Sequence, residues 1–329
     1  MATASTPLLN IWAVSDGRAG IEAQVTGLAD AVARLAPAEI SIKRIAWKAP
    51  FGRLPWGLIP PRLALERRSG VGPPWPDIWI AAGRATLPLS TRMRRWSRGE
   101  TFVVQTQDPR TALGAFDLVI PPAHDGLAGP NVFPIVGAPN RMSPERLASE
   151  LARFQARIAD LPRPRIALIV GGRSRAFDLP PQRAAEMARE VARAVGGTGG
   201  SILVSFTRRT PPAARRILSE GLGALPGWIW DGEGENPYTA FLAAADAILV
   251  TEDSTNLATD AAATGKPVQV LAMAGASPKF ARFHADLEQR GIARRFAGDL
   301  RIGPESGAYA PLDETNRAAR ELLRRFSAR

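Results

Sequence analysis

The sequence predicts an α/β protein built from two doubly wound, Rossmann-like domains that face a cleft. Three observations support this fold class. The chain has 329 residues, and single hydrophobic cores usually divide at about 250–300 residues. Short apolar runs alternate with amphipathic stretches, which predicts parallel sheets with right-handed crossovers. The alternation then restarts after a Pro- and Arg-rich stretch at residues 161–165.

The first half contains runs that are short, apolar and rich in β-branched residues, as buried parallel strands are. The predicted strands cover residues 8–15, 40–47, 77–82, 101–106, 117–120 and 131–136. Residues 21–35 predict a helix, because Val25, Leu28 and Val32 fall on one face. Residues 48–76, rich in Pro, Gly and Trp, predict a long irregular connection with one short helix.

The second half repeats this pattern after a helix at residues 144–160, for which Ser143 is the expected N-cap. The predicted strands cover residues 165–170, 201–206, 227–230, 247–251 and 267–271. The predicted helices cover residues 181–195, 212–221, 237–245, 255–264, 278–290 and 314–326. We therefore predict an N-terminal domain at residues 1–160 and a C-terminal domain at residues 161–329.

Composition narrows the possible chemistry. The formal net charge is +11 and is spread over both halves, so the sequence favours attraction to phosphate over a basic nucleic-acid-binding arm; genome composition is the alternative reading. The chain has no cysteine and two histidines, which excludes disulfides, thiolate metal sites and a His-rich metal site. No apolar run reaches about 18 residues and no signal peptide is evident, so we expect a cytoplasmic protein without metal or nucleic-acid partner.

The segment 247–268 carries the strongest ligand-binding pattern. A buried strand ends at Thr251, and Asp253 and Ser254 are expected to cap a helix that begins at Thr255. The N–H groups and the positive dipole end of such a helix can hold a phosphate. Asp260 lies one to two turns further on, where a carboxylate can accept bonds from two ribose hydroxyls. The alternative is a well-capped packing helix.

Two further loops follow predicted strands of the second half. Glycines permit close backbone approach, and an arginine can reach phosphate oxygens. On that basis the first loop offers Gly171, Gly172, Arg173 and Ser174. The second loop offers Thr207 and Arg208 as a phosphate clamp. A plain turn is the alternative for the first loop, and a solvated loop is the alternative for the second.

The first half supplies three candidate catalytic residues. Asp16 follows the first strand and is either a base or a carboxylate that bonds the N–H groups of its own loop. His124 and Asp125 form a candidate acid/base pair, because histidine titrates near neutrality. Adjacent residues on an extended chain point in opposite directions, so these two residues need not act together. A structural histidine is the alternative.

The segment 247–268 resembles the nucleotide-sugar site of GT-B glycosyltransferases, which the non-hydrolysing sugar-nucleotide epimerases share. The resemblance implies that Asp260 binds the donor ribose and that Ser254, Thr255 and Asn256 face the diphosphate. It also implies that residues 1–160 lie on the acceptor side and residues 161–329 on the nucleotide-sugar side. The last helix is then expected to pack back on the N-terminal domain.

Seven motifs in order along the chain are similar to those of the plant "elongated mitochondria" fission family, which has many bacterial members. The motifs are SDGRAG, QDPR, HDGL, GAPNR, GGRS, TRRTP and TEDSTN…TGKPV. Together the resemblances imply a glycosyltransferase that uses a nucleotide-diphosphate sugar without metal or cofactor. A lipid-linked or envelope acceptor at an anionic membrane would place it at the inner face of the cytoplasmic membrane. The alternatives are a sugar-nucleotide epimerase and a non-catalytic adaptor.

Overall fold

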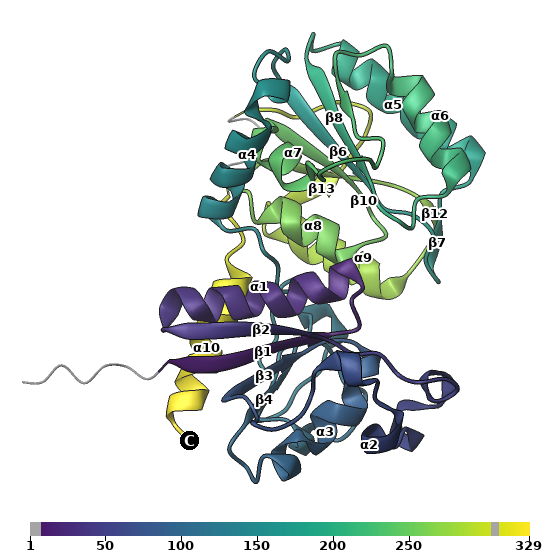
Figure 1. The fold of residues 1–329 in the computed structure, drawn as a ribbon. Coiled ribbons are helices and arrows are strands. Elements are labelled where there is room, and N and C mark those ends of the chain that lie inside the picture. Colours follow the sequence, from purple (N-terminus) through teal and green to yellow (C-terminus); the bar gives the residue numbers. More distant parts are fainter. Residues whose placement is uncertain (1–7, 304–308) are drawn as a thin grey trace, which may run out of the picture. The chain divides into compact units, whose positions relative to one another are not determined.

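The computed structural model describes residues 8–303 and 309–329, which form two compact units (Figure 1). The first unit holds the residues up to Arg141 together with Asp313–Arg329, and the second unit holds Met142–Leu312. The sequence predicts this boundary later, between residues 160 and 161. The difference arises from α4 (Pro144–Ile158), which is capped by Ser143 as expected and packs within the second unit. Its Arg157 guanidinium lies 3.7 Å from the ring centroid of Trp228.

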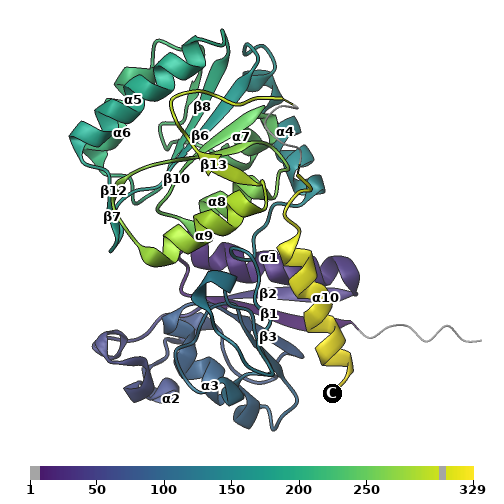
Figure 2. The ribbon, with the colours of Figure 1, turned by 180° about the vertical axis from the view of Figure 1, so that it is seen from behind.

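The first unit is a parallel five-stranded sheet in the order β2-β1-β3-β4-β5. Its strands are β1 (Leu9–Ser15), β2 (Ala38–Arg44), β3 (Ile78–Ala81), β4 (Phe102–Gln105) and β5 (Leu118–Val119). Side chains alternate between two cores, as the pleat requires. Ile11 packs with α1 (Ala19–Leu35) and α10 (Glu314–Ser327), while Trp12 packs with α3 (Leu87–Trp96). The last helix therefore completes the core of the first unit (Figure 2).

Three details of the first unit differ from the sequence prediction or add to it. Residues 131–136 form only isolated bridges, at Val132 and Ile135, because Pro134 between them has no N–H to donate. The irregular connection holds α2 (Pro61–Ala64) and three 3₁₀ turns. The helix α3 was not predicted; half of its ten residues are polar or charged. Among the described helices, none has the length and apolar character needed to cross a bilayer.

The second unit is a six-stranded parallel sheet in the order β13-β11-β10-β6-β8-β9. Its strands are β6 (Arg165–Val170), β8 (Ser201–Phe206), β9 (Gly227–Ile229), β10 (Ala247–Thr251), β11 (Val268–Leu271) and β13 (Ala293–Arg295). The chain moves outward from β6 through β8 to β9, and then returns to the other side of β6 at β10. The direction of winding therefore reverses between β6 and β10.

Helices cover both faces of this second sheet (Figure 1). One face carries α5 (Pro181–Gly196) and α6 (Pro212–Leu222), whose Met187 and Leu218 share a core with Leu168. The remaining helices of the unit are α7 (Tyr238–Ala244), α8 (Thr255–Ala262) and α9 (Pro278–Gln289). A short antiparallel pair, β7 (Phe177–Asp178) with β12 (Ala274–Gly275), and the edge strand β13 were not predicted. Two Rossmann-like sheets confirm the predicted fold class.

The backbone at Asn140 passes close to Gly27 of α1, and this contact gives a first testable prediction. A Cβ added to this glycine of α1 would lie 2.2 Å from the carbonyl oxygen of Asn140. Alanine normally stabilises a helix interior relative to glycine by about 0.5–1 kcal/mol, but here the overlap forces the backbone apart. We expect Gly27→Ala to lower the free energy of unfolding by about 1–3 kcal/mol in thermal or urea unfolding.

Gly196 provides the matched control, because a Cβ at this end of α5 would meet its nearest neighbour, Leu225, at an ordinary 3.8 Å. Gly196→Ala is expected to leave the unfolding midpoint unchanged or to raise it. Equal behaviour of the two variants would contradict the packing of α1 against residue 140.

Candidate functional site

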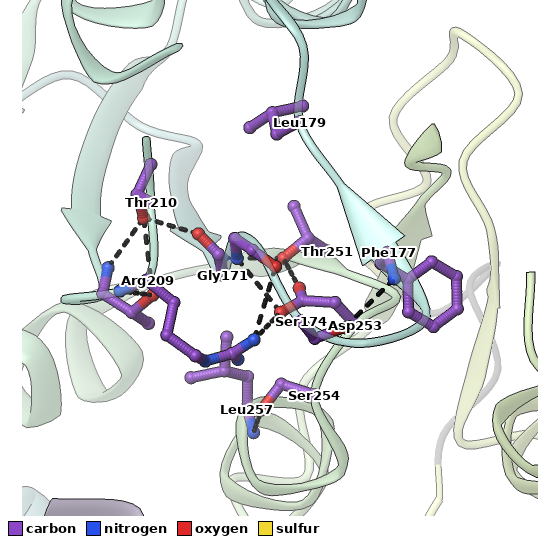
Figure 3. A network of polar contacts seen from close by, with 12 residues as sticks. Gly171, Ser174, Phe177, Leu179, Arg209, Thr210, Thr251, Asp253, Ser254 and Leu257 are labelled. Carbon is purple, nitrogen blue, oxygen red and sulfur yellow. Dashed lines mark hydrogen bonds and ion pairs between the residues drawn. The ribbon is translucent and has the colours of Figure 1, made fainter. Parts of the chain in front are cut away.

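The loops that follow β6, β8 and β10 meet at the carboxyl edge of the second sheet (Figure 3). This is where the winding reverses, and doubly wound sheets bind their ligands in the crevice at such a point. Gly171 and Gly172 follow β6, Arg209 and Thr210 lie in the loop after β8, and Asp253 follows β10. The structure therefore brings the three predicted loops of the second half together.

Asp253 lies at the centre of this network, with a side chain that is fully buried. Its Oδ2 accepts a hydrogen bond of 3.0 Å from the Gly172 N–H, and its Oδ1 accepts one of 2.7 Å from the Thr251 hydroxyl. The Arg209 Nη1 atom lies 2.7 Å from Oδ2. A buried carboxylate is tolerated only when it is paired and hydrogen-bonded in this way. Asp253 thus links all three loops.

The two glycines are required by close approach within the protein. A Cβ on Gly171 would lie 2.0 Å from Asp253 Oδ1, and a Cβ on Gly172 would lie 2.1 Å from the carbonyl oxygen of Arg209. The Gly171 N–H donates to Thr251 Oγ1 at 2.7 Å, and the Gly172 N–H donates to Asp253. Both N–H groups are thus bonded within the protein, and a diphosphate contact at these glycines stays a prediction.

Arg173 and Ser174 shape the same loop. The Arg173 guanidinium donates to both carboxylate oxygens of Asp178, at 2.8 and 3.3 Å, and holds the pKa of that carboxyl below its usual value. The Ser174 hydroxyl accepts hydrogen bonds from the N–H groups of Ala176 and Phe177. Both side chains stabilise the turn in this structure, and their predicted contact with a ligand stays a prediction.

The loop after β8 divides its two arginines between different roles. Arg209 takes the buried contact with Asp253, and the Thr210 hydroxyl donates to the Val170 carbonyl at 3.0 Å. The predicted contacts were Thr207 and Arg208. Thr207 is held within the loop by its N–H bond to Thr210, whereas Arg208 is exposed and has no polar partner among the described residues. Arg208 is therefore the cation of this loop that remains available to an anion.

The amino end of α8 lies at the same edge of the sheet. Ser254 is the N-cap, and its Oγ accepts a 3.4 Å hydrogen bond from the Leu257 N–H. Asp253 was expected to share the capping, but its carboxylate turns to the β6 loop. Thr255 and Asn256 form the first turn and are partly exposed. The dipole end of α8 and Arg208 are thus two sources of positive potential at this edge.

Asp260 lies further along α8 and faces α7. Its carboxylate accepts a 2.8 Å hydrogen bond from the Tyr238 hydroxyl. Burial raises the pKa of Asp260 to about 7, although the Tyr238 hydrogen bond opposes this shift. Lys266, in the Gly-Lys-Pro-Val stretch, bonds the Leu242 and Ala243 carbonyls at the end of α7. Asp260 and Lys266, both in the segment 247–268, therefore hold α7 against the region of α8.

The first-unit candidates are also positioned by local contacts. Asp16 accepts hydrogen bonds from the Arg18 N–H at 3.2 Å and from Arg18 Nε at 2.7 Å, which favours the loop-shaping reading. His124 and Asp125 lie on a 3₁₀ turn, and His124 Nε2 is 3.9 Å from Asp125 Oδ1. The 3₁₀ turn replaces an extended backbone here and brings the two side chains to the same side. Among the described residues, no group of three metal-ligating side chains is present.

Sequence reasoning missed Thr251, Arg209 and Thr210 as members of the network. The signal for Thr251 was its place at the end of a buried strand, where an inward hydroxyl can support the next carboxylate. Nothing in the run Arg208-Arg209 distinguishes the arginine that pairs with Asp253 from the one that does not. That distinction depends on the loop geometry after β8.

Comparison with known proteins identifies the family. The sequence profile described as mitochondrial fission ELM1 matches residues 19–326. The chain belongs to the mitochondrial fission ELM1 family. Mitochondrial fission protein ELM1 of Arabidopsis thaliana is 32% identical over 282 residues, which cover 77% of this chain and 65% of the plant protein. The chain therefore spans just under two thirds of the length of this ELM1 relative.

Solved structures show the fold of this ELM1-family chain. A UDP-GlcNAc 2-epimerase from Neisseria meningitidis matches with a TM-score of 0.54 at 10% identity, covering 98% of this chain and 100% of that chain. The glycosyltransferase of kitacinnamycin matches with a TM-score of 0.50 at 14% identity, covering 98% and 96%. These similarities confirm the GT-B-like fold. At identities this low they show the fold and do not show a shared function.

Removal of the Asp253 carboxylate is expected to destabilise the second unit. Asp253→Ala leaves the Gly172 N–H, the Thr251 hydroxyl and the Arg209 guanidinium without their shared acceptor. Breaking a buried ion pair costs about 3–5 kcal/mol, so the urea midpoint should fall markedly. Asp299→Ala is the control, because Asp299 forms an exposed pair with Arg301. Equal midpoints for the two variants would contradict the central role of Asp253.

The raised pKa of Asp260 predicts how stability depends on pH. The folded-state pKa is about 7 and the unfolded value is 3.8, so between these values the folded state binds more protons. Stability from this group is therefore greatest below pH 4 and is lost as the pH rises to about 7, by up to about 4 kcal/mol. Asp260→Asn should become more stable relative to the wild type between pH 4 and 8 in urea unfolding. A constant difference across that range would refute the shift.

Proposed function

We propose that this ELM1-family chain is a glycosyltransferase that binds a nucleotide-diphosphate sugar at the carboxyl edge of β6, β8 and β10. The observation that carries the proposal is the reversal of winding between β6 and β10, with Arg208 and the amino end of α8 at that same edge. A UDP-GlcNAc 2-epimerase of this fold was solved with UDP-GlcNAc bound, which supports a nucleotide-sugar ligand.

The charges of the site suit a diphosphate leaving group. Asp253 compensates the charge of Arg209 within the buried network. Arg208 and the first-turn N–H groups of α8 then provide the positive potential that stabilises the charge developing on the diphosphate. In this proposal the chain itself supplies that stabilisation, and the reaction uses neither a metal nor a separate cofactor. Asp260 and Tyr238 together offer the polar edge for the ribose hydroxyls.

The acceptor hydroxyl requires a base, and we assign this role to His124. Asp16 is engaged by the backbone and side chain of Arg18, so its carboxylate is less available. Asp125 lies beside the His124 imidazole and would stabilise the imidazolium formed when the acceptor proton is taken up. The transfer forms the bond from the acceptor oxygen to the sugar and breaks the bond from the sugar to the diphosphate.

The second candidate is a sugar-nucleotide epimerase, which the similarity to the Neisseria structure favours. An epimerase needs acid and base groups on both sides of the sugar, and the second unit offers Asp260, whose pKa lies near neutrality. A non-catalytic adaptor is the third reading, suggested by the printed name of the Arabidopsis relative. Product analysis with a radiolabelled donor distinguishes an epimerised sugar from a transferred one.

Nucleotide binding is the decisive measurement. We expect calorimetry and thermal shift to show saturable binding of one among UDP, GDP, CMP and ADP, with or without its sugar. Arg208→Ala should weaken that binding about tenfold, because a charged hydrogen bond to phosphate contributes about 1.5–3 kcal/mol. Arg216→Ala is the matched control, since Arg216 is an exposed arginine on α6. Absence of binding by a folded protein would reject the proposal.

A further inference from the structure

The chain segment after β2 forms a loop with a closed neck, which we call the 48–68 loop. The Lys48 N–H donates to the Ala64 carbonyl at 2.8 Å, and the Glu66 N–H donates to the Ala46 carbonyl at 2.9 Å. Beside these bonds, Trp47 forms a bridge with Leu65. In both ribbon views α2 and its neighbouring turns extend from the end of the first sheet (Figures 1 and 2). The loop is therefore an ordered projection tied at its base.

Three leucines of this loop are exposed. Leu54, Leu58 and Leu63 are exposed by 41%, 69% and 70%, whereas Ile59 and Ala64 of the same loop are exposed by 4% and 0%. Three of the most exposed large apolar side chains among the described residues thus lie within ten positions of one another. Burying a leucine is worth about 1.5–3 kcal/mol. An ordered loop that buries some apolar side chains and presents three others in this way indicates an apolar environment outside the protein.

The same loop is strongly basic. It carries one acidic residue, Glu66, whose carboxylate lies 2.5 Å from the Arg68 guanidinium. Its basic residues are Lys48, Arg53, Arg62, Arg67 and Arg68. A loop that combines exposed leucines with exposed cations matches the chemistry of an anionic bilayer, in which acyl chains lie beneath a layer of phosphates. A protein partner would have to offer both an apolar surface for the leucines and acidic groups for the cations.

The tryptophans do not form this surface. Trp56, Trp75 and Trp96 pack against the cluster that contains the buried Trp12 and Trp79, and the Trp75 and Trp96 rings stack with centroids 6.0 Å apart. The exposed large apolar side chains of the loop are therefore its leucines.

We infer that the 48–68 loop docks the first unit on an anionic phospholipid bilayer, with Leu54, Leu58 and Leu63 in the interfacial region and the arginines on lipid phosphates. The loop follows β2, so it lies at the carboxyl edge of the first sheet, where Asp16 follows β1. If the proposed glycosyltransferase function holds, this places the acceptor side next to the membrane. The docking itself does not depend on that function.

Flotation with vesicles of phosphatidylcholine, with or without phosphatidylglycerol, tests the inference on the full chain. We expect binding to the anionic vesicles that weakens as salt is added, because the cations are exposed. The variant Leu54→Ser/Leu58→Ser/Leu63→Ser should lose binding at least tenfold. The matched control is Leu8→Ser/Leu35→Ser/Ile42→Ser, whose side chains are exposed by 63%, 47% and 49% outside the loop. The control should bind as the wild type does.

The absence of cysteine allows a second, direct readout. Leu58→Cys and Leu35→Cys each give one thiol for an environment-sensitive fluorophore. Anionic vesicles should shift the emission to the blue for the label at 58 and leave the label at 35 unchanged. The inference is overturned if wild-type protein does not float with anionic vesicles, if both triple variants lose binding equally, or if the label at 58 stays in water.

Nucleotide affinity, measured without vesicles, separates this inference from the proposed function. The loop variant should keep the nucleotide affinity of the wild type. Vesicle binding without nucleotide binding would retain the docking surface and reject the glycosyltransferase. Nucleotide binding without vesicle binding would retain the proposed nucleotide site and reject the docking surface.

Discussion

The buried carboxylate of Asp253 is the interaction on which the second unit's ligand edge depends. It accepts from the β6 loop, from the end of its own strand and from the loop after β8. The winding reverses between β6 and β10, so the loops that follow these two strands lead to different helices, and the Asp253 carboxylate connects them at the edge of the sheet. A buried carboxylate stabilises such a connection only when its oxygens are hydrogen-bonded and its charge is paired. The glycines after β6 follow from this requirement, since a side chain there would occupy the place of the carboxylate.

Most of the fold could be predicted from the sequence because its strands are buried on both faces. Continuous apolar runs such as those of β6, β8 and β10 leave little ambiguity in type or extent. The elements that were missed are the ones that lack this signal. Half of the residues of α3 are polar, and β13 is a short strand at the edge of its sheet. The helix α4 was predicted, but its place in the second unit depends on contacts that only the folded chain reveals.

The candidate site was predictable as a set of loops but not as a set of contacts. Topology alone brings the ends of parallel strands to one edge, so the grouping of the three loops follows from their order. Which of Arg208 and Arg209 turns inward is decided by the backbone after β8 and by the position of Asp253. The pairing of His124 with Asp125 likewise depends on a 3₁₀ turn where the sequence indicates an extended segment.

The return of α10 to the first unit has a consequence for synthesis on the ribosome. Ala318 and Leu322 complete the core that contains Ile11 and Val25, yet they are translated after the whole of the second unit. During elongation, α1 alone is available to cover this face of the first sheet while the second unit already has all of its strands. The N-terminal region therefore reaches its native packing last, and nascent chains pass through a stage that exposes apolar surface to chaperones.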